Sequence, residues 1–193
     1  CHGAPSPMMF SEYITYLEKR EKKKVTAFNF RDKKFGWDNY IETYCFGDNE
    51  RKSTLYRKLF YEEIVLRPSC HNCRYTSLDR VADLTVADAW NIQKVYPEFD
   101  YKKGVSLCIA DTEKGIRLLE HIKVESVWKP AKIEDFMQPN MQRPTAPGID
   151  REAFWVDYQR KGFEYVLNKY AKKRIWVRIA NAVRYYSAKF LKK

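Results

Sequence analysis

The stretch from Arg67 to Trp90 constrains the chain most, because it combines two cysteines at CxxC spacing with a short apolar segment that carries two aspartates. Pro68 biases the residue before it towards extended backbone, so we expect Cys70 and Cys73 to follow a strand end and lie on a turn. Two cysteines three positions apart can direct both sulfurs at one metal centre. The spacing predicts two ligands for zinc, an iron–sulfur cluster or a redox dithiol; burial as two small core residues is the alternative.

A second polar feature, the segment R-D-K-K-F-G-W, lies between two expected strands at residues 25–30 and 38–46, which form a hairpin. Arg31, Lys33 and Trp37 in this segment would suit a flavin that carries phosphate, because the cations offer charge and the indole offers a flat surface. The residues alone favour equally a basic hairpin tip with a half-buried tryptophan.

Asp88 is expected at the end of a short strand over residues 84–86, near the place where ligand contacts often gather in mixed sheets. Asp83 lies five positions earlier, and extended backbone would point the two side chains to opposite faces. We therefore do not expect the two carboxyl groups to act as a paired acid and base.

Helical periodicity predicts main helices at residues 8–22, 53–63, 114–122 and 150–170. Strand patterns add residues 105–110 and 124–128, and residues 47–52 are expected to form a polar loop. The predicted class is α+β, with a mixed β-sheet flanked by helices and a C-terminal helical extension. Residues 1–137 are expected to form the main domain, 138–149 a Pro-rich linker, and 150–193 a helical, basic extension.

The net charge of +11 belongs mainly to the tail, because residues 171–193 contain eight Lys or Arg and no acid, leaving +3 for the first 170 residues. An apolar face is expected on a helix over residues 172–193, formed by Ile175, Ile179, Val183, Tyr186 and Phe190. Such a helix can dock on its own domain, on a partner protein or on an anionic membrane surface.

The rest of the composition limits where the protein works. No stretch approaches the roughly 20 apolar residues that span a bilayer, and the five cysteines are not spaced as a disulfide framework. We expect a cytoplasmic protein with reduced thiols, with a membrane-peripheral position through residues 172–193 as the alternative. No nucleic-acid partner is expected.

Five motifs together carry a family resemblance. The runs L-R-P-S-C-H-N-C-R-Y, A-D-L-T-V-A-D-A-W and K-G-V-S-L-C-I-A-D-T-E-K-G, with C-H-G-A-P-S-P and F-R-D-K-K-F-G-W, resemble the C-terminal domain of the beta-subunit family of coenzyme F420 hydrogenases and dehydrogenases. The resemblance extends to about Phe154. The chain departs from the family pattern at Ser6, where a cysteine usually stands, and at Ala87, where a glycine usually precedes the aspartate.

The resemblance implies an oxidoreductase subunit that passes electrons between a [4Fe-4S] cluster, a flavin (FAD) and a deazaflavin-like or other acceptor. Cys70 and Cys73 are the expected cluster ligands, with Cys1 as a third. Flavin contacts are expected from Arg31, Lys33, Trp37 and Asp88. The implied partner is a redox protein or an N-terminal ferredoxin-like half, which we expect to precede this chain; similar family members often occur among bacterial polysaccharide-synthesis proteins.

A non-catalytic scaffold domain, stabilised by zinc or a cluster, is the alternative function. Zinc would use the same cysteines together with histidines such as His71 or His2. Absorption near 400 nm in protein made without air would favour the cluster, and a colourless zinc protein would favour the scaffold.

Overall fold

The computed structural model describes residues 1–172. Fifteen elements follow in chain order: α1 (Pro7–Glu21), β1 (Ala27–Asn29), η1 (Lys33–Phe35), β2 (Glu42–Phe46), β3 (Asn49–Ser53), α2 (Leu55–Tyr61), η2 (Pro68–Asn72), β4 (Leu84–Asp88), α3 (Ile92–Val95), β5 (Ser106–Ala110), α4 (Glu113–Val124), η3 (Ile133–Phe136), η4 (Pro139–Met141), α5 (Arg151–Val166) and η5 (Leu167–Lys172). The first four η elements are 3-10 helices and η5 is a π-helix.

Two compact units alternate along the sequence. Unit 1 consists of Cys1–Gly3, Asp32–Asn39 and Pro68–Thr145, and unit 2 consists of Ala4–Arg31, Tyr40–Arg67 and the described residues from Ala146 onward. Each unit has its own hydrophobic core. The predicted consecutive segments 1–137, 138–149 and 150–193 stay a prediction about domains.

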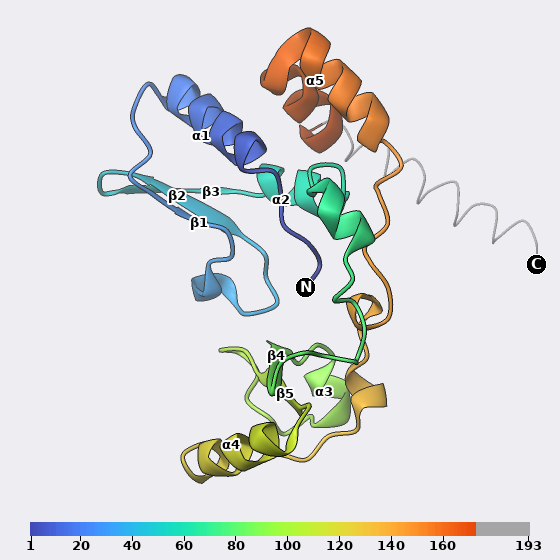
Figure 1. Ribbon diagram of the computed structural model, residues 1–193. Coiled ribbons are helices and arrows are strands. Elements are labelled where there is room, and N and C mark those ends of the chain that lie inside the picture. Colours follow the sequence, from blue (N-terminus) through green and yellow to red (C-terminus); the bar gives the residue numbers. More distant parts are fainter. Residues whose placement is uncertain (173–193) are drawn as a thin grey trace, which may run out of the picture. The chain divides into compact units, whose positions relative to one another are not determined.

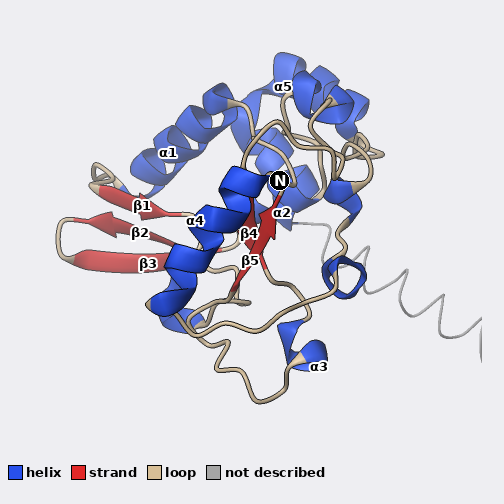
Figure 2. Ribbon diagram, turned by 60° about the horizontal axis from the view of Figure 1, so that its bottom comes forward, coloured by secondary structure: helices blue, strands red, loops and turns tan. Residues whose placement is uncertain are grey.

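Unit 2 is built around an antiparallel sheet in the order β1-β2-β3, whose strands lie side by side in red in Figure 2. Helix α1 lies along this sheet (Figure 1) and buries Met9, Tyr13, Tyr16 and Leu17, which recur at helical spacing. The helix begins at Pro7, where proline is well tolerated, and ends at Glu21, after which Lys22 adopts the left-handed conformation. These buried residues pack with side chains of β2, α2 and α5 into one core.

The core region of unit 2 also contains a buried acid, Glu42. Glu42 is 1% exposed, and its carboxylate accepts hydrogen bonds from the Tyr13 hydroxyl at 3.3 Å and from the Arg57 backbone amide. Burial is the main cause that raises the pKa of Glu42, because the charged form loses its water. The acid thus joins β2 to α1 and α2 at an electrostatic cost.

Unit 1 contains a second antiparallel sheet, in which β4 pairs with β5 so that Val86 faces Cys108 and Asp88 faces Ser106. Helix α4 follows β5 directly, and the hydroxyl of Thr112 caps it by accepting from the Gly115 amide at 3.1 Å. Asp83 accepts from the Thr112 hydroxyl at 2.7 Å and from Lys114 at 3.0 Å, and these hydrogen bonds lower its pKa.

The α+β class is confirmed, although the strands form two small antiparallel sheets and not one mixed sheet. A short turn at residues 47–48 joins β2 to β3, and such a turn produces antiparallel neighbours. The expected loop at residues 47–52 is wrong: β3 occupies most of it. Its sequence N-E-R-K-S is exposed and polar, as suits an edge strand, so no alternating apolar pattern marks it.

The expected strand at residues 124–128 is also wrong, because α4 runs to Val124 and the following residues up to 132 have no regular structure. Val124 and Val127 are 84% and 85% exposed, so their β-branched side chains are not held in any sheet. The apolar face predicted over residues 172–193 falls outside the described residues. Within the described part, no helix combines the length and apolar character needed to cross a bilayer.

Candidate metal and cofactor site

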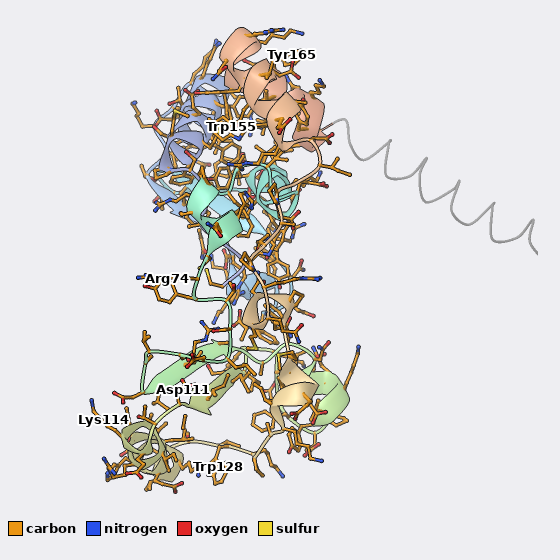
Figure 3. The ribbon with its side chains drawn as sticks, turned by 45° about the vertical axis from the view of Figure 1, so that its right-hand side comes forward. Arg74, Asp111, Lys114, Trp128, Trp155 and Tyr165 are labelled. Atoms are coloured by element: carbon orange, nitrogen blue, oxygen red, sulfur yellow. The ribbon has the colours of Figure 1, made fainter. Side chains whose placement is uncertain are left out.

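The CxxC turn lies in unit 1, with Cys70 inside the 3-10 helix η2 and Cys73 just after it. Both side chains are half-buried. The Thr76 hydroxyl donates to the Cys73 carbonyl at 2.9 Å and so closes the turn, while Arg74 points away from the ribbon (Figure 3) with its guanidinium over the Tyr75 ring. The expected turn is therefore present, and the cysteines are not fully buried core residues.

His71 stands between the two cysteines and anchors the turn. Its Nδ1 lies 2.8 Å from the main-chain carbonyl oxygen of Thr145. The Thr145 hydroxyl donates to the main-chain carbonyl of His2 and accepts from the Asn140 side-chain amide at 2.7 Å. We call these four residues, His2, His71, Asn140 and Thr145, the Thr145 network; it lies within unit 1 and ties the turn to the first residues of the chain.

Cys1, the third expected ligand, is exposed and belongs to the same unit. Cys45 is half-buried in β2 of unit 2. Cys108 is exposed on β5. Unit 1 thus gathers all the cysteines that the sequence assigned to a metal.

The cysteine sulfurs are the type of ligand that a thiolate-bound metal requires, although the described residues do not form a complete site. Thiolates select zinc, copper(I) and iron–sulfur clusters. The Nε2 atom of His71 is buried and has no hydrogen-bond partner among the described residues. A nitrogen in this situation is free to bind a metal ion. Yet residues 1–172 contain no group of three or more His, Cys, Asp or Glu side chains arranged to hold a metal ion.

Trp37 and Asp88, both predicted flavin contacts, meet directly. The indole Nε1 donates to Asp88 Oδ1 at 3.2 Å, and the indole ring stacks on Trp90 with 4.6 Å between centroids and 11° between planes. Trp37 is only 1% exposed. Its role in the described structure is to fill the core of unit 1 and to orient the Asp88 carboxylate.

Gly104 makes this packing possible. Its φ of +96° is a conformation that residues with a side chain rarely adopt, and an added Cβ would lie 2.7 Å from Trp37 Cδ1. The backbone of the loop before β5 therefore lies directly against the indole, and the Trp37 amide donates to the Lys102 carbonyl at 3.3 Å.

The two predicted cations fall in different units. Lys33 is exposed at the start of η1, in unit 1, and the Asp32 carboxylate that caps this helix accepts from the Lys34 amide at 3.0 Å. Arg31 belongs to unit 2, where its guanidinium lies over the Tyr40 ring at 5.7 Å. Lys33, Trp37 and Asp88 therefore belong to the same unit as the cysteine turn.

Three participants were not predicted: Trp90, Gly104 and Thr145. Trp90 had a usable signal, since it ends the motif A-D-L-T-V-A-D-A-W two positions after Asp88. Gly104 also had one, as a glycine directly before a strand. Thr145 had none, because two of its partners, His71 and His2, lie 74 and 143 positions away in the chain.

Comparison with known proteins gives one match. A family model that describes the C-terminal part of the coenzyme F420 hydrogenase/dehydrogenase beta subunit matches residues 1–135, more than two thirds of the chain. The resemblance inferred from the five motifs is confirmed. Searches of curated proteins and of solved structures found no match.

Proposed function

We propose a specific electron-transfer role for this chain, which belongs to the coenzyme F420 hydrogenase/dehydrogenase beta-subunit family through its C-terminal domain. Membership makes the domain broadly redox-related. The finer proposal is that the domain passes electrons between a [4Fe-4S] cluster, a flavin and a deazaflavin-like or other acceptor, as part of an oxidoreductase. A link to polysaccharide biosynthesis belongs to the same proposal.

One observation carries this proposal: unit 1 contains the CxxC turn, Cys1 and the Trp37–Asp88 pair together. Cys70, Cys73 and Cys1 would hold the cluster, because thiolates are the usual ligands of such clusters. Since the described residues do not complete a site, at least one ligand comes from elsewhere, such as an N-terminal ferredoxin-like half or a partner protein. When bound, the cluster supplies one-electron chemistry, and the protein orients and shields it.

For the flavin, Asp88 and Lys33 are the candidate contacts in unit 1, and Arg31 is the candidate in unit 2. A lysine acts on phosphate as a point charge, whereas an arginine can form two parallel hydrogen bonds. The buried Trp37 acts through Asp88, whose carboxylate it fixes by the Nε1 hydrogen bond. The stacking surface expected of Trp37 is covered on one face by Trp90.

Zinc remains a second candidate because of the buried His71 Nε2 atom, which suits a mixed sulfur and nitrogen donor set. In that case the domain is a scaffold and not an electron carrier.

The test is the metal and flavin content of the full chain purified without air. About four iron atoms per site with broad absorption near 400 nm support the cluster. Stoichiometric zinc in a colourless protein supports the scaffold and contradicts electron transfer. Flavin released on denaturation supports the flavin half of the proposal, and repeated failure to bind added flavin contradicts it.

A further inference from the structure

We propose that Thr145 is a positioning residue for the metal centre, and that it holds the CxxC turn and the segment carrying Cys1 in register through two separate polar atoms. The inference rests on the proposed metal centre and adds to it a residue from the Pro-rich stretch 138–149. That stretch was expected to be a linker.

The first contact fixes the imidazole between the two cysteines. A carbonyl oxygen can only accept, so the 2.8 Å contact to Thr145 requires that His71 Nδ1 carries the proton. The neutral ring then has its lone pair on Nε2, the buried atom that has no hydrogen-bond partner among the described residues. An imidazole fixed in this way limits how far the turn around Cys70 and Cys73 can move.

The second contact fixes the other cysteine segment. A threonine hydroxyl has one proton, and here it is donated to the main-chain carbonyl of His2, the residue after Cys1. The lone pairs of the same oxygen accept from Asn140, which orients the hydroxyl. Thr145 therefore bonds to His2, the residue after Cys1, and also to His71, which lies between Cys70 and Cys73.

Residues that orient metal ligands without touching the metal have measurable effects. Their removal typically weakens metal binding by 10- to 100-fold. Thr145→Val is the cleanest change, since it keeps the shape and the main-chain carbonyl but loses the hydroxyl. We expect this variant to release iron to a chelator roughly 10–100-fold more readily than the parent chain, with an altered electron paramagnetic resonance spectrum of the reduced cluster.

Two conservative variants separate positioning from ordinary stability. Thr145→Ser restores the hydroxyl and should restore both iron retention and the spectrum. His71→Asn keeps a side-chain N–H where Nδ1 lies, so it should retain more iron than His71→Leu. Thr112→Val, which removes the cap of α4 in the same unit, is the control for lost stability alone and should leave the spectrum unchanged.

The outcomes are distinct. A parent chain that binds no metal contradicts the proposed function itself. A parent that binds iron, with Thr145→Val equal to it in chelator resistance and spectrum, contradicts the positioning role alone. Loss of iron in His71→Asn equal to that in His71→Leu assigns the effect to Nε2 and overturns the role of the Thr145 carbonyl.

Discussion

The two units cover similar lengths of described chain but are stabilised in different ways. The core of unit 2 contains sixteen buried residues, many of them aromatic, whereas that of unit 1 contains six within the described part of the chain. Tyr13 alone stacks on Tyr16 and Tyr56 and meets Phe28 edge to face. In unit 1 the comparable place is taken by one indole pair, Trp37 and Trp90.

The difference suggests where function resides. Burial of apolar surface is the main favourable term in folding, so a unit with a small core depends more on polar contacts and on bound groups. Unit 1 contains the CxxC turn, the Thr145 network and the Trp37–Asp88 hydrogen bond. Because metal binding to a folded site adds to folding free energy, we expect bound metal to stabilise unit 1 more than unit 2.

The largest expected effect tests that dependence. Cys70→Ser and Cys73→Ser should each remove most bound iron, since a hydroxyl oxygen is a poor substitute for thiolate sulfur. Amide hydrogen exchange should then rise mainly in unit 1. Cys108→Ser, an exposed change in the same unit, is the matched control and should retain iron. Full iron content in both turn variants would remove the metal from this turn.

The next prediction concerns the core of unit 2. Phe154 is 0% exposed and packs edge to face on Tyr170 with 5.3 Å between ring centroids. Phe154→Ala should lower the free energy of unfolding by about 3–5 kcal/mol through lost burial and the cavity that remains. Val156→Ala, at a side chain 46% exposed on the same helix, should change it by less than about 0.5 kcal/mol.

The iron content of Phe154→Ala tests whether the core of unit 2 affects metal binding in unit 1. Folded Phe154→Ala protein should bind as much iron as the parent, because its loss of stability arises in the unit without the candidate ligands. Parallel loss of iron would show that the stability of unit 2 sets the metal affinity of unit 1, so that the two units would not differ in their dependence on metal.

Gly104→Ala should have a smaller effect, local to unit 1. The substitution places a Cβ 2.7 Å from Trp37 Cδ1 and strains a backbone with φ of +96°, so we expect a loss of about 2–4 kcal/mol in unfolding free energy. Gly47→Ala is the matched control, since its φ is +60° and an added Cβ meets nothing within 4 Å. Urea unfolding of both variants gives the comparison; equal losses would mean that backbone strain alone, and not the indole, requires glycine at position 104.

Sequence reasoning succeeded where local signals are strong. Tyr13 and Leu17 follow the helical period of α1, and Thr112 caps α4 two positions after β5 ends, so these elements could be predicted. It failed at β3, whose exposed polar residues resemble a loop, and at Val124, whose apolar character resembles a strand although it ends a helix. Pairing with β2 decided the first case, whereas residues 124–128 pair with no strand among the described residues.

In the candidate site, too, features within one turn could be predicted from the sequence, whereas contacts between distant residues could not. Cys70 and Cys73 lie on one turn, as their spacing after Pro68 predicted, and their role as ligands stays a prediction. The contact of Trp37 with Asp88 joins residues 51 positions apart, and the bond of Thr145 with His2 joins residues 143 apart. No local pattern encodes such distances, because they depend on how strands pair and units form. Likewise the burial of Trp37 could be settled only by the structure.

The smallest expected effect is a pH dependence in unit 2. Burial raises the pKa of Glu42, so between its unfolded and folded pKa values the native state holds a proton that the unfolded state has released. The contribution of Glu42 to stability is therefore greatest at acid pH and falls as pH rises through the raised pKa. Asp83 and Asp157, whose pKa values are lowered by hydrogen bonds, contribute in the opposite direction.

Glu42→Gln isolates that term, because subtracting the parent cancels the other carboxyl groups. Glutamine keeps an acceptor for the Arg57 amide and a polar group for Tyr13, but needs no ionised form in the core. Weaker hydrogen bonds offset part of the gain, so we expect the variant to be more stable at pH 7 by about 1 kcal/mol. The advantage should shrink steadily as pH falls towards 4, measured by urea unfolding at several pH values. An advantage that grows on acidification would mean that the folded state stabilises the Glu42 carboxylate, and that its hydrogen bonds outweigh the effect of burial.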